Sequence, residues 1–293
     1  MKVSLRCKAA LCSVALLALI VIVWQAVTCT ASAPAASAMS PEQAEYAALM
    51  GKGPPVDGVP AYRVVIANGF PTPAQFGSAV AKQLAHPFRD DGPNNKGIGI
   101  QLGYSLLRVA AGYAIAVAVA LPLGFLIGMS RLAFLTLDPF IQVLKPISPL
   151  AWMPIALYTI KSSSTSAIFV IFICSVWPML INTVFGVANV RRDWLNVART
   201  LEVPPLRRAF EVILPAAAPT IVTGMRISMG IAWLVIVAAE MLVGGTGIGY
   251  FLWNEWNNLS LSNVLFSVLL IGLVGMALDM LFAQLQKKVT YVD

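Results

Sequence analysis

Charged residues are scarce in this sequence. Only 11% of its 293 residues are Asp, Glu, Lys or Arg, whereas 58% are hydrophobic, and the mean hydropathy is +0.79. Soluble domains carry about 25% charged residues. The shortage therefore excludes an ordinary soluble globular domain and indicates a chain that lies in a lipid bilayer.

Residues that bind metals or perform acid–base chemistry are also few. His86 is the only histidine, and no nucleophile–base pair can be placed. The cysteines lack metal-ligand spacing and mostly lie in or beside apolar runs, where cysteine behaves as a small hydrophobe. They are Cys7, Cys12, Cys29 and Cys174. We therefore predict neither an enzyme nor a metal or cofactor site.

The sequence also lacks a phosphate-binding loop. The glycine-rich run 244–249 follows no strand, and the pattern G-x-x-x-x-G-K-[ST] occurs nowhere, so the chain is not expected to bind ATP itself. The net charge is +7, but the cations sit at the ends of apolar runs without a basic and aromatic patch. The charge is therefore interpreted as topological, and no nucleic-acid partner is predicted.

Long apolar runs, in contrast, are abundant. Each of six runs reaches or exceeds the roughly 17–25 residues with which a helix crosses the hydrocarbon core. They cover approximately Leu11–Val27, Tyr104–Met129, Phe140–Ile160, Ala167–Val187, Ala216–Val243 and Val264–Leu285. The predicted fold class is all-α integral membrane, with six transmembrane helices.

Lysine and arginine indicate on which side of the membrane each connection lies, because cytoplasmic loops carry an excess of both. One side would hold Lys2, Arg6, Lys8, Arg131, Arg191, Arg192, Arg199, Arg207, Arg208, Lys287 and Lys288. The opposite short connections hold Lys161 only. We therefore expect both termini and the segment 193–215 to be cytoplasmic.

The predicted organisation has three parts: an N-terminal transmembrane helix (1–30), a periplasmic loop segment (31–100) and a transmembrane core (101–290). The loop segment is rich in Ala, Pro and Ser and broken by Gly and Pro, which favours a loop over a separate domain. The first helix also resembles a cleavable signal peptide, since basic residues precede it and small residues follow. Its length favours a retained helix.

The segment 193–215 has the pattern of two short amphipathic helices joined by Pro204 and Pro205. The first would place an apolar face against another apolar surface through Trp194, Leu195, Val197, Ala198 and Leu201. The second would carry an apolar stripe of Leu206, Ala209, Phe210 and Ile213, and Leu214–Pro215 would close it. A paired-helix elbow of this kind suits docking into a groove on a soluble partner.

This elbow resembles the cytoplasmic coupling motif of binding-protein-dependent ABC importer permeases. That motif runs Glu-Ala-Ala, three residues, Gly, nine residues, then Ile, one residue, Leu-Pro. Ala198, Leu214 and Pro215 match it, whereas Asn196 and Glu202 depart from it. The resemblance implies that the elbow contacts an ATPase through Asn196, Ala198, Glu202, Arg207, Phe210, Ile213, Leu214 and Pro215.

The flanking residues extend the resemblance over roughly residues 62 to 290. The stretches 216–230, 236–249 and 253–263, together with the departures in the elbow, look like the nitrate/nitrite/cyanate branch. The resemblance implies the type I ABC importer permease (MetI-like) fold in a bacterial inner membrane. It also implies three partners: an ABC ATPase subunit, a periplasmic or lipid-anchored solute-binding protein, and a second permease copy. Nitrate is the implied solute; bicarbonate or a sulfonate such as taurine is the near alternative.

Charges and helix breakers inside the spans indicate a translocation pathway. Lys145 and Pro146 begin a proline-rich stretch that also contains Trp152, and it predicts either a broken helix along the pathway or a packing kink. Arg226 lies near the membrane midplane and suits either attraction of an anion or structural pairing. Glu240 is expected near the outer surface, in a gate or a helix contact, and Asp279 beside water or a cytoplasmic cation.

A transporter that works without an ATPase is the alternative from another class. It would require inverted repeats and intramembrane carboxylates for ion coupling. No repeat is evident, and Glu240 is the only acidic residue expected deep in a span. The sequence therefore favours an ATP-driven importer.

Overall fold

A computed structural model describes residues 5–28, 70–92 and 96–289, and every regular element in this part of the chain is a helix. The all-α prediction is confirmed. The residues divide into two compact units, Met1–Ala81 with Leu261–Asn263, and Lys82–Ser260 with Val264–Asp293. Most of the predicted periplasmic loop, residues 31–69, lies outside the described residues.

The first unit contains α1 (Leu5–Thr28) and most of α3 (Pro73–Ala85). Its contacts centre on Trp24, whose ring lies 6.1 Å from that of Phe70 and 5.5 Å from that of Phe76, centroid to centroid. The indole N–H of Trp24 also donates to the carbonyl of Pro71 at 2.9 Å. Aromatic clusters of this kind mark the ends of membrane spans, where amphipathic rings meet both lipid and water.

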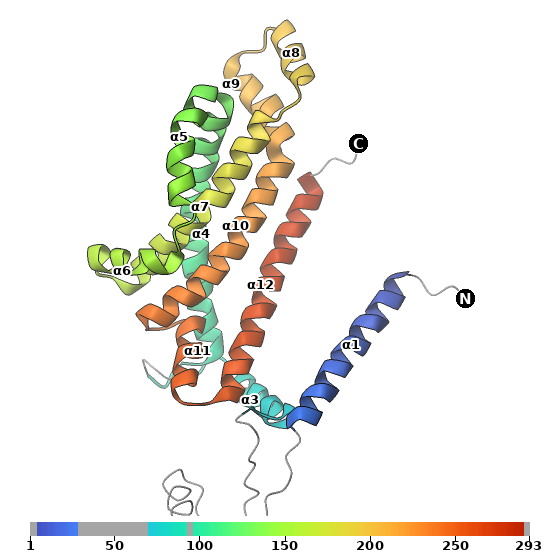
Figure 1. The fold of residues 1–293 in the computed structure, drawn as a ribbon, viewed down its shortest axis with the longest axis vertical. Helices are drawn as coiled ribbons and strands as arrows, with labels where there is room; N and C mark the ends of the chain where they lie inside the picture. The colour runs from blue at the N-terminus through green and yellow to red at the C-terminus, as the bar shows by residue number, and fades with distance from the viewer. Residues whose placement is uncertain (1–4, 29–69, 93–95, 290–293) are drawn as a thin grey trace, which may run out of the picture. The chain divides into compact units, whose positions relative to one another are not determined.

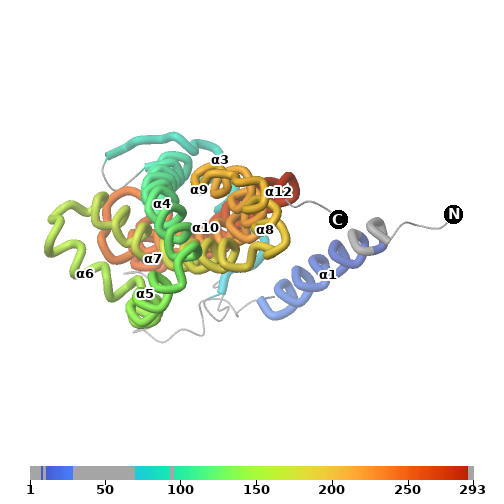
Figure 2. Tube along the Cα trace, turned by 90° about the horizontal axis from the view of Figure 1, so that it is seen from above, coloured from blue at the N-terminus to red at the C-terminus, as the bar shows by residue number. Residues whose placement is uncertain are grey.

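The second unit is centred on α4 (Ile98–Met129), α7 (Ser163–Ala188) and α10 (Leu214–Val243). On one side of this centre lie α5 (Arg131–Leu144) and α6 (Pro149–Ile160), and on the other lies α12 (Leu261–Val289) (Figures 1 and 2). Helices α4 and α7 approach closely because α4 presents glycines. A Cβ atom at Gly112 would lie 2.8 Å from the Ile168 carbonyl, and one at Gly124 2.7 Å from the Cβ of Thr183. Small residues allow such close packing in membranes, where the hydrophobic effect does not drive helices together.

Within residues 5–28, 70–92 and 96–289, five helices are long and apolar enough to cross a membrane. A sixth crossing is counted if α5 (Arg131–Leu144) and α6 (Pro149–Ile160) form one span, yet these two helices are bent by 91°. The span predicted over Phe140–Ile160 is therefore interrupted, in agreement with a broken helix at the proline-rich stretch. Ser148 adopts an extended conformation (φ −59°, ψ 137°) before Pro149, because proline excludes the α region for the residue that precedes it.

The elbow comprises α8 (Arg192–Thr200), α9 (Pro205–Arg208) and a π-helical turn, η2 (Ala209–Ile213). The predicted closure at Leu214–Pro215 is wrong, because the helix continues through both residues into α10. Pro215 has no N–H for the usual bond to the preceding turn. The wider π turn, in which Leu214 donates to the Ala209 carbonyl, adjusts the backbone before this proline.

The last two helices are α11 (Ile248–Asn257) and α12 (Leu261–Val289). Hydrogen bonds join α10 to α12 and to α4, and an aromatic contact joins α4 to α12. The indole N–H of Trp233 donates to the Ile271 carbonyl at 2.9 Å, and the Tyr113 hydroxyl donates to the Met225 carbonyl at 2.9 Å. The Tyr113 ring also packs edge-on against Phe282.

Candidate coupling surface and translocation pathway

The elbow packs one face against the helix bundle. Ala198 and Ile213 are buried, and Ile213 joins a core cluster with Val187, Ala217 and Ile221. The sequence placed Ile213 beside Phe210 on the face offered to a partner, and this placement is wrong for Ile213. Its side chain is already covered by the ends of α7 and α10.

Other positions of the elbow leave large apolar side chains uncovered. We call these residues the coupling surface: Trp194, Val197, Leu201, Leu206 and Phe210, which are 48–75% exposed. Single exposed apolar residues are common on proteins, but a cluster marks an interaction site. Asn196, Glu202 and Arg207 are also exposed, and Arg207 pairs with Glu211 at 2.8 Å. Leu214 and Pro215 are exposed at the start of α10.

Glu202 ends α8 in a left-handed conformation, with φ +52°. The N–H of Val203 donates to the Ala198 carbonyl at 3.0 Å, and the N–H of Glu202 to the Arg199 carbonyl at 3.0 Å. Both bonds and the left-handed residue are features of the Schellman motif, in which glycine is the usual left-handed residue. Glu202 therefore occupies a glycine-type backbone position, as the resemblance to the coupling motif implied.

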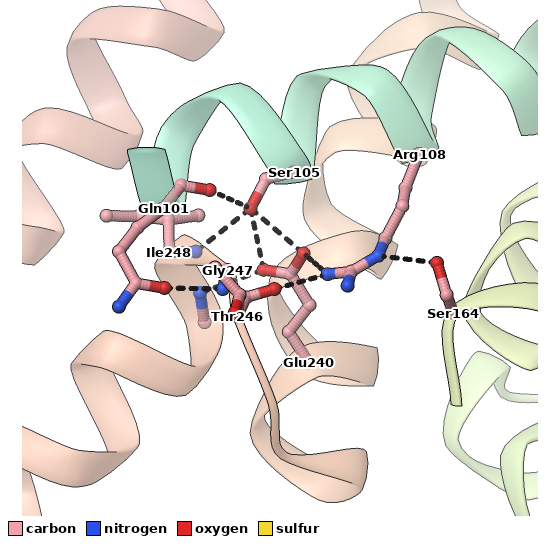
Figure 3. Close-up of polar contacts among 9 residues, drawn as sticks. Gln101, Ser105, Arg108, Ser164, Glu240, Thr246, Gly247 and Ile248 are labelled. Carbon is pink, nitrogen blue, oxygen red and sulfur yellow. Dashed lines mark hydrogen bonds and ion pairs between the residues drawn. The ribbon is translucent and has the colours of Figure 1, made fainter. Parts of the chain in front are cut away.

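Glu240 lies in a buried polar network that joins α10 to α4 (Figure 3). Its carboxylate is 2% exposed and accepts hydrogen bonds from the Ser105 hydroxyl at 2.8 Å, Nη1 of Arg108 at 2.8 Å and the Gly249 N–H at 3.1 Å. A buried carboxylate is stable only when it is paired and hydrogen-bonded in this way. Its position fits the predicted helix contact.

The same network holds the loop between α10 and α11 (Figure 3). Arg108 also donates to the Thr246 carbonyl at 2.5 Å and, through Nε, to the Ser164 hydroxyl at 3.1 Å. Gln101 accepts from the Gly247 N–H at 2.6 Å. A side chain at Gly247 would overlap the Glu240 carboxylate, so only glycine fits there.

Sequence reasoning missed Gln101, Ser105 and Arg108. Arg108 carried a usable signal, because it is a cation inside an apolar span, and such a charge requires a partner. Glu240 was a carboxylate near the same end of another span. Ser105 and Gln101 carried no comparable signal, since single polar residues are frequent in such helices.

Arg226 forms a bidentate ion pair with Asp279 on α12. Nε and Nη2 of Arg226 each lie 2.6 Å from a carboxylate oxygen of Asp279. Gln286 accepts from Nη1 of Arg226 at 3.3 Å and donates to the Thr223 hydroxyl at 2.9 Å. The structure therefore pairs Arg226 with Asp279, and the cation that meets Asp279 is this arginine of α10. The Asp279 side chain is still 54% exposed.

Lys145 lies apart from both ion pairs. It lines a hollow of about 670 Å³ between the end of α4, α5 and the end of α7. The polar residues of this hollow are Arg131, Asp138, Gln142, Lys145 and Asn189. Pro146 lies in the break between α5 and α6, and Trp152 is half-buried on α6. The predicted pathway residues therefore occupy three separate places: Glu240 lies in the network with α4, Arg226 pairs with α12, and Lys145, Pro146 and Trp152 lie in the region of α5 and α6.

Comparison with known proteins agrees with this architecture. Residues 120–291 match the family described as the inner membrane component of binding-protein-dependent transport systems. A chain from structures of inward-facing conformations of the MetNI methionine ABC transporter superimposes with a TM-score of 0.60 at 13% identity. The match covers 66% of this chain and 96% of that one, and the fold is therefore the type I ABC importer permease fold.

Two groups of relatives are similar in sequence. The nitrate import permease protein NrtB of Synechocystis sp. is 44% identical over 222 residues, which are 76% of this chain and 81% of the relative. NrtB of Leptolyngbya laminosa is 46% identical over 70% of this chain and 74% of the relative. The bicarbonate transport system permease protein CmpB of Synechocystis sp. is 44% identical over 70% of this chain and 73% of the relative. The chain therefore belongs to the family of inner-membrane permease components of binding-protein-dependent transport systems.

Proposed function

We propose that this chain is the permease subunit of an ATP-driven importer for a small, singly charged, planar oxyanion, and that nitrate is its solute. The similarity to nitrate import permeases carries this proposal, with 42–46% identity over 72–76% of the chain for the Synechocystis and Synechococcus proteins and over 70% for the Leptolyngbya protein. Bicarbonate is the second candidate, because the bicarbonate permeases are 44% identical over 70% of the chain.

The coupling surface is the proposed contact with a separate ATPase subunit. Its exposed apolar residues lie on α8, α9 and η2, which protrude beyond the bundle (Figure 1). ATP binding would close the ATPase dimer and displace the docked elbow, which is continuous with α10. The spans would then alternate between inward-facing and outward-facing arrangements.

The distribution of cations supports the proposed orientation. Five arginines lie on or next to the elbow, and this excess of cations supports a cytoplasmic position for this end of the bundle: Arg191, Arg192, Arg199, Arg207 and Arg208. Both termini would be on the same side. A periplasmic or lipid-anchored binding protein would deliver the anion to the opposite end, and a second copy of the chain would complete the pathway.

Reconstitution tests the proposal directly. The permease, its ATPase and its binding protein are placed in liposomes, and uptake of labelled nitrate is measured with and without ATP. We expect ATP-dependent nitrate uptake that excess unlabelled nitrate abolishes and taurine leaves unchanged. Uptake of labelled bicarbonate without uptake of nitrate would assign the second candidate, and uptake of neither anion would refute the proposed function.

A further inference from the structure

We propose that Lys145 is the cation that attracts the anion inside the membrane, and that the hollow along α5 is the inner part of its path. This inference rests on the proposed function and names the residue that favours an anion within the pathway. It is carried by the depth of Lys145, by its lack of a carboxylate partner and by the neutralisation of the other deep cations.

The first observation is the depth of Lys145. The helical rise places Arg108, in the outer network, about 31 Å from Met129 at the end of α4, which is the thickness of a hydrocarbon core. Helix α5 begins at Arg131, level with that end, and stands upright beside α4 and α7 (Figure 1). Its 14 residues span about 21 Å, so Lys145 at its far end lies inside the apolar layer.

The second observation is that Lys145 is exposed and has no carboxylate within 4.0 Å among residues 5–28, 70–92 and 96–289. A lysine at the centre of a lipid-facing helix is energetically unfavourable. Such residues therefore face a partner or a water-filled cavity. The hollow that Lys145 lines supplies the cavity.

The third observation is the charge of the hollow. Its ionisable residues are Arg131, Asp138 and Lys145, which leaves one net positive charge. Nε2 of Gln142 donates to the Asp138 carboxylate at 3.4 Å, and Nδ2 of Asn189 donates to the Phe185 carbonyl at 2.8 Å. Each of these amide groups has a second N–H. Apolar side chains form the remaining walls. A passage with weak dielectric screening and one excess cation attracts an anion and repels a cation.

The fourth observation is that the other deep cations among the described residues, Arg226 and Arg108, are each neutralised by a carboxylate. Both nitrogens that Arg226 directs at Asp279 are engaged at 2.6 Å, so this pair presents no net charge to a solute. Arg108 is neutralised by Glu240 and bonded to the Thr246 carbonyl. Lys145 is therefore the deep cation whose charge remains available.

The first experiment removes the charge in the assembled transporter. Lys145→Gln is compared with Lys145→Arg and with Lys161→Gln, which removes an exposed lysine at the other end of α6. Uptake of labelled nitrate is normalised to assembled complex, and basal ATP hydrolysis is measured alongside. We expect Lys145→Gln to lower the maximal uptake rate about tenfold, and Lys145→Arg and Lys161→Gln to remain within about twofold of the unmodified protein.

Unchanged normalised uptake in Lys145→Gln would overturn the inference while the proposed function stands. An equal loss in Lys145→Gln and Lys161→Gln would also overturn it, because the effect would then reflect surface charge rather than this position. If the unmodified transporter moved neither nitrate nor bicarbonate, the proposed function and the inference would fall together.

The second experiment tests the hollow without any transported solute. In a background with the four native cysteines replaced, Lys145→Cys is exposed to a charged, membrane-impermeant methanethiosulfonate in permeabilised vesicles. We expect rapid modification, whereas Ala156→Cys, at a buried position of α6, stays unmodified. An unreactive cysteine at position 145 would mean that the position is not in contact with water, and the inference would be wrong.

Discussion

At the scale of single residues, Glu202 has an unfavourable backbone conformation. A left-handed φ costs an L-residue about 1–2 kcal/mol, and glycine avoids this cost. We predict that Glu202→Gly raises the stability of the purified permease by up to about 1 kcal/mol. Thermal unfolding in detergent measures the change. Glu202→Val serves as the comparison, since a β-branched residue fits this φ poorly, and equal melting temperatures for the two variants would contradict the prediction.

The two ion pairs that involve Glu240 and Glu211 differ in burial. Loss of one partner from a buried pair costs about 3–5 kcal/mol, because it leaves an uncompensated charge. We therefore expect Arg108→Gln to destabilise the permease strongly, since Glu240 is 2% exposed. Glu211→Gln removes the exposed Arg207 pair and should cost less than about 1 kcal/mol. The loss of stability is measured as the decrease in the unfolding midpoint of each variant relative to the unmodified permease. Equal decreases for Arg108→Gln and Glu211→Gln would refute this distinction.

At the scale of elements, the elbow has an inner and an outer face, and the two should respond differently to substitution. Phe210→Ala should weaken association with the ATPase, since losing an interface aromatic costs about 2 kcal/mol or more. Ile213→Ala should instead lower the thermal stability of the permease alone, because Ile213 is buried. Co-purification and melting temperature separate the effects. Normal ATPase recovery with Phe210→Asp would exclude the coupling surface from docking.

Helix α4 offers a matched pair of glycines. A methyl group at Gly124 would meet Thr183 of α7 at 2.7 Å, whereas nothing lies within 4 Å of the same atom at Gly103. We expect Gly124→Ala to destabilise the bundle by about 1–3 kcal/mol and Gly103→Ala to be neutral or slightly stabilising. Thermal unfolding of both variants provides the test, and equal melting temperatures would show that α4 and α7 do not depend on this contact.

The sequence predicted what local pattern and span length determine, and it failed where a tertiary partner decides. Apolar length located the spans, and Pro204 with Pro205 located the break in the elbow. Pro215 suggested a helix end, but the preceding π turn carries the helix through it. Arg226 and Glu240 were recognised as deep charges, but their partners Asp279 and Arg108 belong to other helices. The spacing of residues along the sequence does not show which helices lie side by side, so these pairs could not be predicted.

At the scale of the whole molecule, the orientation of the bundle remains a prediction. A cysteine at Asn257, on α11, should react with an impermeant reagent from outside intact cells. One at Arg192, at the start of α8, should react only after permeabilisation. The reason is that the basic residues gather at the elbow end of the bundle. Labelling of position 192 in intact cells would reverse the topology and remove the elbow from the ATPase.

The unbroken run from Pro205 to Val243 has a mechanical consequence. Its 39 residues form a rod of about 58 Å, with the elbow at one end and Glu240 near the other. A rod of that length converts a tilt of about 10° at the ATPase into a displacement of about 10 Å at the opposite end. ATP binding at the proposed ATPase would thus act on the Glu240 network at the opposite end by leverage along one helix, without a relay through neighbouring side chains.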